Sequence, residues 1–473
     1  MSIGNRKQPV PHCTRRLMLI LAFAAMFFFQ GCEQTPLLQR LQAKGLLHIA
    51  TVSGPLSCYL GEKGAAGLEY KLANRFARSQ GMKAVFTVYP TRNAAIHAVK
   101  TGREDMAAGF ILPSTKHKAV TYQSNPWLET NPQLAHTMGR KALDPTAAGD
   151  TEIIVSANGY LSELLERKKL PGSPLPGLSE ELILAGTNAG TYGHTLSTTA
   201  QLLAHTNQLP NLVPGVSLAE STTVHWLFNR SFDDSLRNAA NRFLAAQKHA
   251  GKLQQLRERY IDKLPKRNYV TRRDFWQHVK QRLPAYIDLF RQAEKDTGID
   301  WRLLAAIGYQ ESHWNPRAAS PTGVRGLMML TKATAKQQRI NNRLDPRQSI
   351  LGGARHLLWM EKRIPERIRG DDLLWFTLAS YNIGYGHLED ARILTQRDNA
   401  DPDSWEAVKL RLPLLGHKKY SATLKHGRAR GREPVSYVEN IRYYYRLLTY
   451  WDNAKNGRNC TSGTRQRRLA LKN

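Results

Sequence analysis

Glu311 is the residue of this sequence best placed to act as a general acid. Leu304, Ile307 and Glu311 follow one another at helical spacing, so one helix face would carry two apolar side chains and then a carboxyl group. Asp300 can cap the start of this helix, and Pro316 must end it. A partly desolvated carboxyl group at the negative end of a helix dipole has a raised pKa, as a general acid requires. From the spacing alone, an exposed carboxylate on the last turn is the more common arrangement.

Small and aromatic residues that could contact a sugar chain follow Glu311 in the sequence. Gly323 and Gly326 permit a tight loop whose backbone can approach a ligand closely. Tyr381 and Asn382 place a stacking face and an amide at a predicted junction of helix and loop, a pair suited to N-acetyl sugars. Tyr437 would add a second aromatic wall.

These segments resemble the motifs of the lysozyme-like lytic transglycosylase domain. The motifs occur in the family's order: Gln310-Glu311-Ser312 with Trp314-Asn315-Pro316, then Ser320 to Thr331, then Ala379 to Gly384, then Tyr437 to Ile441. Met329 stands where most members have Gln, which is typical of the F type of membrane-bound lytic murein transglycosylase. The resemblance implies that Glu311 is catalytic. It also implies substrate-binding roles for Ser312, Ser320, Gly326, Met329, Tyr381, Asn382 and Tyr437.

The shortage of acids near Glu311 favours a lyase over a hydrolase. Glycosidases use two carboxylates, and here Asp345 and Asp390 are second candidates only by default. One acid suffices in lytic transglycosylases, because the C6 hydroxyl of N-acetylmuramic acid attacks its own anomeric carbon. The resemblance therefore implies cleavage of the β-1,4 bond between N-acetylmuramic acid and N-acetylglucosamine. The product would be a 1,6-anhydro sugar, formed without a cofactor, and no Cys or His spacing indicates a metal site.

The first half of the chain alternates strands and helices. Leu46–Val52, residues 84–88 and Met106–Ile111 are predicted strands, separated by predicted helices over 67–80 and 94–100. This order predicts βαβ units and a largely parallel sheet. Further helices are predicted around residues 236–244 and 253–260.

Three stretches of this half resemble the two-lobed periplasmic solute-binding domain of the amino-acid-binding type. They are Gly67 to Ala73, Gly102 to Met106, and Gly251 to Tyr260. The resemblance implies a ligand site that includes Glu69, with Lys116 in place of the usual carboxylate-binding Arg and Thr198 in place of the ammonium-binding Asp. These departures fit either a muropeptide or peptide ligand, or a domain that no longer binds a free amino acid.

The second half is predicted to be helical from Phe275 to Asp452, punctuated by Gly and Pro, including the pair Gly352-Gly353. The sequence thus predicts an α/β two-lobed periplasmic-binding-protein-like domain followed by an all-α lysozyme-like domain. The expected boundaries are a signal peptide over 1–31, linkers over 33–42 and 264–272, domains over 43–263 and 273–453, and a basic tail over 454–473.

The charge and the N-terminus indicate the compartment. The 473 residues carry a formal charge of +30, spread over both halves, which suggests a polyanionic partner. Basic residues and an apolar run from Leu17 to Phe29 resemble a secretory signal, and Gly31-Cys32 resembles a bacterial lipobox. Glu33 after Cys32 favours the outer membrane. An uncleaved or differently cleaved anchor is the alternative.

Export argues against nucleic acid as the partner and favours peptidoglycan glycan strands near the inner face of the outer membrane. Cys58 and Cys460 could pair in an oxidising periplasm, although two cysteines carry little information. Two other functions stay open: a solute-binding protein with a non-catalytic peptidoglycan-binding domain, and a muramidase-type hydrolase. A basic nucleic-acid-binding or surface-binding protein is a third, and the leader argues against it.

Overall fold

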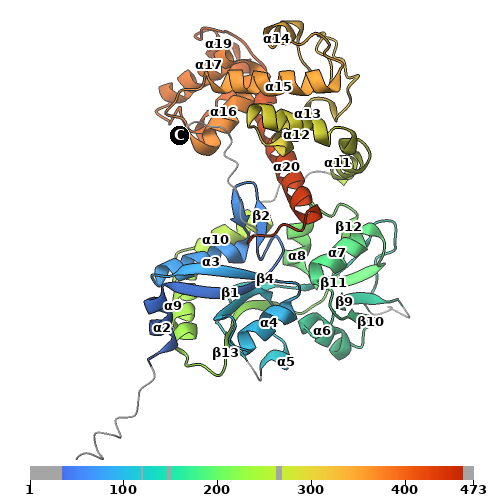
Figure 1. The fold of residues 1–473 in the computed structure, drawn as a ribbon, viewed down its shortest axis with the longest axis vertical. Coiled ribbons are helices and arrows are strands. Elements are labelled where there is room, and N and C mark those ends of the chain that lie inside the picture. The colour runs from blue at the N-terminus through green and yellow to red at the C-terminus, as the bar shows by residue number, and fades with distance from the viewer. Residues whose placement is uncertain (1–34, 119–120, 146–150, 263–268, 462–473) are drawn as a thin grey trace, which may run out of the picture.

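The computed structural model describes residues 35–118, 121–145, 151–262 and 269–461 (Figure 1). The predicted signal peptide, Cys32 and the end of the predicted basic tail lie outside the described residues. The chain folds into a two-lobed α/β domain and a helical domain that stands at one end of it (Figure 1). In the ranges that the structure describes, no helix is both long and apolar enough to cross a membrane.

The first lobe is built on a mixed sheet. Its strand order is β4-β1-β5-β13-β6, and β4, β1 and β5 run parallel as predicted. The expectation of a largely parallel sheet is wrong at the other edge, where β13 pairs antiparallel with β5 and β6, because the chain re-enters this sheet from the second lobe. The strands are β1 (Leu46–Val52), β4 (Lys83–Tyr89), β5 (Met106–Ile111), β6 (Thr121–Gln123) and β13 (Thr222–Asn229), and β7 (Leu128–Thr130) extends the pairing of β13.

Helices cover this sheet where apolar periodicity predicts them. The predicted helices correspond to α3 (Leu68–Ser79), α4 (Arg92–Lys100), α9 (Ser235–His249) and α10 (Lys252–Arg257). The structure differs from the sequence analysis before residue 43. Residues expected to be a linker form α2 (Leu37–Lys44), and its Leu37 and Leu41 are buried in the core of the lobe. Two leucines four residues apart are enough to bind a short helix to the domain.

The second lobe is also built on a sheet that mixes parallel and antiparallel strands. Its sheet has the order β10-β9-β11-β8-β12, with β8 antiparallel to both of its neighbours. The strands are β8 (Pro132–Thr137), β9 (Ile153–Ser156), β10 (Gly172–Leu175), β11 (His194–Thr198) and β12 (Leu212–Ser217). The helices are α6 (Tyr160–Lys168), α7 (Glu180–Ala189) and α8 (Thr199–His205).

The C-terminal half is helical, as predicted. In its described part, only isolated bridges among Ala319, Arg325 and Leu330 have strand-like pairing. Helix α13 lies in the core, with Leu303 to Ile307 fully buried. The helices are α11 (Tyr269–Gln281), α12 (Ile287–Thr297), α13 (Trp301–Ser312), α14 (Lys332–Gln337), α15 (Pro346–Glu361), α16 (Gly370–Ile383), α17 (Tyr385–Arg397), α18 (Trp405–Val408), α19 (Lys418–Ser421) and α20 (Arg432–Lys455).

Helix α20 joins the two domains. Its C-terminal end lies against the hairpin of β2 (Tyr59–Gly61) and β3 (Gly64–Ala66), as Figure 1 shows. Asn453 donates from its side chain to the carbonyl of Leu60 at 2.7 Å, and the rings of Tyr59 and Tyr450 lie 6.3 Å apart.

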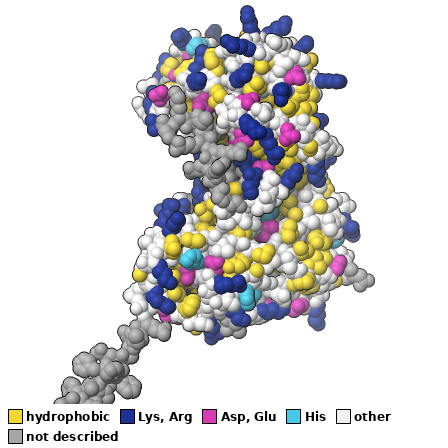
Figure 2. All heavy atoms as spheres, viewed as in Figure 1, with side chains coloured by type: hydrophobic (Ala, Val, Ile, Leu, Met, Phe, Trp, Pro, Cys, Tyr) yellow, Lys and Arg dark blue, Asp and Glu magenta, His cyan; other side chains and the backbone are white. Residues whose placement is uncertain are grey.

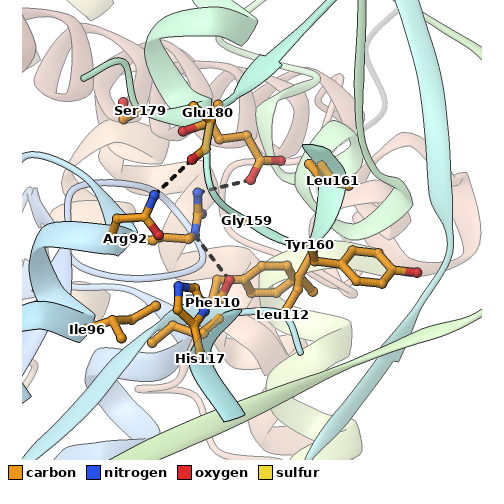
Figure 3. Close-up of a pocket in the computed structure, with 14 residues that line it drawn as sticks. Arg92, Ile96, Phe110, Leu112, His117, Gly159, Tyr160, Leu161, Ser179 and Glu180 are labelled. Atoms are coloured by element: carbon orange, nitrogen blue, oxygen red, sulfur yellow. Dashed lines mark hydrogen bonds and ion pairs between the residues drawn. The ribbon is translucent and has the colours of Figure 1, made fainter. Parts of the chain in front are cut away.

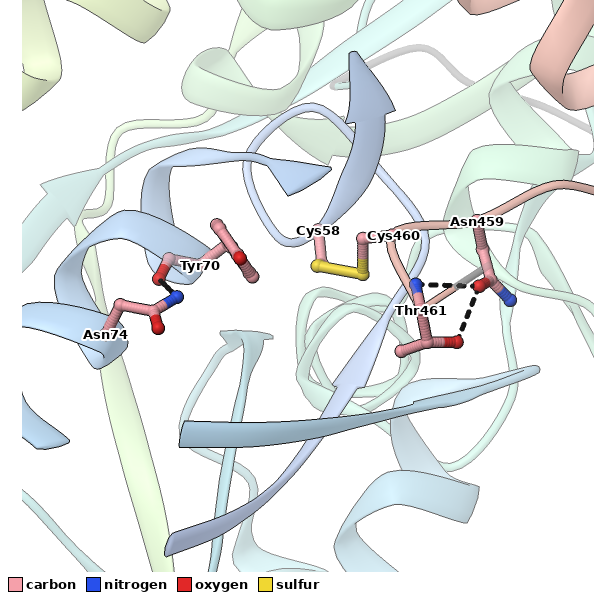
Figure 4. Close-up of a disulfide and its surroundings, with 6 residues drawn as sticks. All are labelled: Cys58, Tyr70, Asn74, Asn459, Cys460 and Thr461. Atoms are coloured by element: carbon pink, nitrogen blue, oxygen red, sulfur yellow. Dashed lines mark hydrogen bonds between the residues drawn. A yellow bond between two sulfur atoms is a disulfide. The ribbon is translucent and has the colours of Figure 1, made fainter. Parts of the chain in front are cut away.

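A disulfide bond completes this junction. It joins Cys58, next to β2, to Cys460, just after α20, across 402 residues of sequence (Figure 4). The start of the predicted basic tail is therefore bound covalently to the first lobe. The pairing that the sequence left open is present in the structure.

Removal of this bond is expected to lower the melting temperature. Cys58→Ser, Cys460→Ser and the double variant should lose the same stability, roughly 2–4 kcal/mol, because each removes the same cross-link. Calorimetry under oxidising conditions measures the loss, and wild type in reductant should match the variants. Equal melting temperatures for wild type and variants would mean that the bond does not stabilise the junction.

Candidate active site

Helix α13 delivers Glu311 to the site. Asp300 caps the helix, accepting a hydrogen bond from the Arg302 backbone at 2.8 Å. The helix ends at Ser312, before Pro316, because His313 and Trp314 both adopt left-handed backbone angles, with φ of 51° and 56°. The buried Trp314 ring then packs back and donates to the carbonyl of Ala305 at 2.8 Å. Glu311 therefore sits on the last turn, as its spacing predicts.

The carboxyl group of Glu311 is half-buried and has one hydrogen-bond partner among the described residues. The phenol of Tyr437, on α20, donates to its Oε1 at 2.5 Å. Burial raises the pKa of Glu311 to about 7, and the hydrogen bond from Tyr437 opposes this rise. The group is thus poised to give and take a proton near neutral pH.

Tyr381 lies next to this pair. Its ring, on α16, stacks on that of Tyr437 with a centroid separation of 6.4 Å and an angle of 15°. Its hydroxyl donates to the carbonyl of Met328 at 3.4 Å. Burial raises the pKa of both phenols well above the ordinary value, so Tyr437 stays a donor toward Glu311. Asn382 is exposed at the end of α16, beside Tyr381.

The loop before α14 lies against the end of α13. Ser312 donates from its hydroxyl to the carbonyl of Leu327 at 2.8 Å, so this predicted substrate-binding group also holds the loop in place. Gly326 has φ of 87°, and a Cβ there would lie 1.8 Å from the carbonyl oxygen of Arg343, so only glycine fits. The half-buried Met329 has φ of 47°, and its backbone donates to the carbonyl of Gly326 at 3.0 Å.

Two further predictions concern the same loop. Ser320 is half-buried, and its hydroxyl forms a 2.8 Å hydrogen bond with the hydroxyl of Thr322. Gly352 and Gly353, expected to punctuate the helices, lie inside α15 instead. A Cβ on Gly353 would come within 2.7 Å of Met328, so the glycines let the loop pack directly on this helix. In a sequence, a pair of glycines that allows close packing looks the same as a pair that ends a helix.

Asp345 and Asp390, which the sequence offered as candidates for a second acid, have other roles in the structure. Asp345 caps α15, accepting from the backbone of Gln348 at 2.8 Å. Asp390 is fully buried and accepts from the backbone of His426 at 3.0 Å. In the described part of the chain, no acidic side chain contributes to the pKa shift of Glu311. No group of three His, Cys, Asp or Glu side chains could hold a metal ion in the same ranges.

The two lobes of the first domain face each other across a second candidate site. Arg92 extends from α4, and its guanidinium pairs with Glu180 of α7 at 2.9 Å (Figure 3). It also pairs with Glu181 of the same helix at 3.0 Å. It also donates to the carbonyl of Gly109 at 2.8 Å. A small cavity of about 60 Å³ lies beside these ion pairs. Its lining includes Ile96, Phe110, Leu112, His117, Tyr160 and Leu161.

The residues predicted from sequence for this site do not line the cavity. Glu69 is buried beneath the sheet, accepts from the backbone of Phe110, and has a pKa raised to about 8 by burial. Lys116 is exposed on α5 (Thr115–Lys118), and Thr198 caps α8 through the backbone of Gln201. The cation at the cleft is Arg92, which sequence reasoning missed because a basic residue at a helix start carries no signal of its own.

Comparisons with known proteins agree with the division of the chain into an α/β domain and a helical domain. The model for "Bacterial extracellular solute-binding proteins, family 3" matches residues 47–263, and that for "Transglycosylase SLT domain" matches 288–403. The "Membrane-bound lytic murein transglycosylase F" of Ectopseudomonas mendocina is 38% identical over 448 residues, covering 91% of this chain and 90% of the relative. That of Alcanivorax borkumensis is also 38% identical, covering 88% and 91%.

The chain belongs to the membrane-bound lytic murein transglycosylase F family. This confirms the resemblance seen in the motifs around Glu311 and in the first domain. It also confirms the fold class, a solute-binding-type α/β domain followed by a helical lytic domain. In this F-type chain the helix that carries Tyr437 also contacts the first domain.

Replacement of Tyr437 should shift the pKa of Glu311 upward. Tyr437→Phe removes the hydroxyl that stabilises the carboxylate, so the pKa should rise above 7, by about half to one unit. Carboxyl ¹³C titration by NMR, assigned with Glu311→Gln, measures the shift. Tyr381→Phe is the matched control because its hydroxyl bonds Met328 and not Glu311. An unchanged or lowered pKa in Tyr437→Phe would contradict this assignment.

Proposed function

We propose that this chain is a lytic transglycosylase that cleaves the β-1,4 bond between N-acetylmuramic acid and N-acetylglucosamine in peptidoglycan. Its product would be a 1,6-anhydromuramoyl end, formed during turnover and remodelling of the cell wall. The observation that carries the proposal is the single half-buried carboxyl group of Glu311, with a pKa of about 7 and a phenol as its partner. Membership of the family supports it.

Each step uses a group present at the site. The protonated Glu311 donates to the glycosidic oxygen, the C1–O bond breaks, and the leaving strand departs as an alcohol. Tyr437 stabilises the resulting carboxylate through its hydrogen bond. The carboxylate then takes the proton from the C6 hydroxyl as that oxygen bonds to C1, so no water is consumed. The acetamido group of the substrate stabilises the cationic centre between the steps.

The flanking residues would position the sugar chain. Ser320, Gly326 and Met329 belong to the loop packed on α13. Tyr381 and Asn382 lie at the end of α16, where the Tyr381 hydroxyl bonds the carbonyl of Met328 in this loop. Ser312 acts through the loop carbonyl that it bonds. We assign these residues to substrate binding on the basis of their positions around Glu311.

Glu311→Gln should abolish release of 1,6-anhydromuropeptides from purified sacculi, with a loss of at least ~100-fold, because Gln cannot donate the proton.

The same variant, Glu311→Gln, should be more stable than wild type above pH 7. Folding raises the pKa of Glu311 from 4.5 to about 7, so wild type loses stability as the pH rises through this range, whereas Gln carries no charge. Mass spectrometry and thermal melts at pH 5 and pH 8 measure both effects. Retained cleavage by Glu311→Gln would refute the mechanism, and reducing-end muramic acid from wild type would indicate a hydrolase.

For the first domain we propose a muropeptide or short peptide ligand, and not a free amino acid. Arg92 already holds two internal carboxylates, so it cannot grip the carboxylate of an amino acid while those pairs stand. The adjacent cavity combines apolar side chains with the polar groups of His117 and Tyr160, and its size suits one side chain of a peptide.

Thermal shift with murein stem peptides and with the free amino acids tests this ligand class. We expect stabilisation by a stem tetrapeptide, reduced at least several-fold in apparent affinity by Tyr160→Ala, which shortens one wall of the cavity. Lys116→Ala is the control because Lys116 does not line the cavity. Tighter binding of a free amino acid than of any stem peptide would contradict the proposal.

We also propose that the protein is anchored by a lipid on Cys32 to the inner face of the outer membrane. The lipobox-like Gly31-Cys32 and the membrane-bound family name support this. Lys and Arg side chains are distributed over both domains (Figure 2), which would hold the chain near the anionic envelope and murein. Cys32→Ser should release the protein from the membrane fraction on cell fractionation, and continued membrane retention would contradict lipid anchoring.

A further inference from the structure

A row of aromatic rings leads away from Glu311 across three helices. Tyr437 on α20 bonds the carboxyl group and stacks on Tyr381 of α16. The ring of His356, on α15, lies 5.1 Å from Tyr381, and Trp359 stacks on His356 at 5.5 Å with an angle of 18°. Each ring thus contacts the next, from the catalytic acid to the end of α15.

A single arginine ends this row. The guanidinium carbon of Arg363 lies 3.6 Å from the centre of the Trp359 ring, close enough for a cation–π contact that holds the guanidinium against the indole. Arg363 is exposed, and Trp359 is half-buried. Burial, together with the charge of Arg363, lowers the pKa of His356 to about 4, so the ring between Tyr381 and Trp359 is neutral at physiological pH.

Arg363 differs from the neighbouring arginines in its charge environment. Arg367 pairs with Asp403, and Arg392 pairs with both Glu389 and Asp403. Across the described residues, no carboxylate lies within 4.0 Å of the Arg363 guanidinium. An arginine fixed by its face on an indole keeps its edge N–H groups directed away from the ring, where they can grip a carboxylate in bidentate fashion.

We propose that Trp359 and Arg363 form a subsite that binds a carboxylate on the lactyl-peptide substituent of muramic acid, in a glycan strand bound at Glu311. Tyr437 and His356 are buried, so only the half-buried Tyr381 and Trp359 would line the path of the strand. Arg363 would recognise the substituent that distinguishes murein from a polymer of N-acetylglucosamine alone. This inference rests on the proposed function, because it assumes that Arg363 and Glu311 bind one strand.

Binding by inactive protein tests the subsite without cleavage. The full mature chain with Glu311→Gln is pelleted with intact sacculi or with chitin, which lacks the lactyl-peptide group. Adding Arg363→Gln should weaken binding to sacculi by about tenfold, the effect of losing one charge-assisted hydrogen-bonded pair, and leave chitin binding unchanged. Arg363→Lys, which keeps the charge without the planar fork, should fall between the two.

Arg367→Gln is the matched control. It removes the same charge four residues away, from an arginine already paired with Asp403, and should not change binding to either polymer. Trp359→Leu should weaken binding to sacculi as Arg363→Gln does and leave chitin binding unchanged, because it removes the ring that holds the Arg363 guanidinium in place. Melting temperatures of all variants establish that each one is folded.

Three results would overturn the subsite: equal weakening on sacculi and chitin by Arg363→Gln, no weakening on sacculi, or the same weakening by Arg367→Gln. Glycan strands freed of their stems by an amidase, added as soluble competitors, identify the carboxylate. The amidase exposes the lactyl carboxylate, which is an amide in intact murein. Competition that depends on Arg363 shows that the subsite accepts this group, and its absence assigns the subsite to the stem, so either result supports the subsite. If wild type released no anhydro product, the cleavage mechanism would fail, while these binding ratios would still decide the role of Arg363.

Discussion

The hydrogen bond from Tyr437 to Glu311 is the contact on which the arrangement of the lytic domain depends. It requires α13 and α20, more than a hundred residues apart in sequence, to pack side by side. That packing buries the carboxyl group enough to raise its pKa, and among the described residues the phenol is the one hydrogen-bond donor to the ionised form. A carboxyl group left in water would be ionised at neutral pH and could not act as an acid. The aromatic side chains and the tight loop are arranged around this requirement.

Helix α20 also makes the two domains one structure. Near its N-terminal end it carries Tyr437, and near its C-terminal end Tyr450 and Asn453 contact the β2–β3 hairpin. The disulfide at Cys460 then secures the chain just beyond the helix. The hairpin of the first domain and Glu311 thus contact opposite ends of one helix. In the first domain, the buried pairs of Arg92 with the α7 glutamates hold the two lobes together from within.

Local patterns in the sequence predicted much of this accurately. Apolar periodicity placed β1, β5 and α3 to within a residue or two, because burial on one face requires regular spacing. The spacing of Leu304, Ile307 and Glu311 predicted the position of Glu311 on the last turn of α13, while its burial needed the tertiary structure. These local patterns failed where the contact that decides the structure joins segments far apart in the sequence. Nothing near Leu37 shows that a short helix has a lobe to pack on, and Gly352-Gly353 looks the same as a breaker or as a packing surface.

The sequence by itself determined the two-domain composition and the family, and it singled out Glu311 as the proposed acid, because these depend on residue types and local spacing. Only the tertiary structure decided which groups surround that acid, that Asp345 and Asp390 are occupied elsewhere, and that Arg92 rather than Lys116 stands at the interlobe cleft. It alone joined Cys58 to Cys460 and placed Arg363 on Trp359 at the end of the aromatic row. The reason is physical: pKa shifts, ion pairs and ring contacts depend on distances in space, and those are set by packing between segments far apart in the chain.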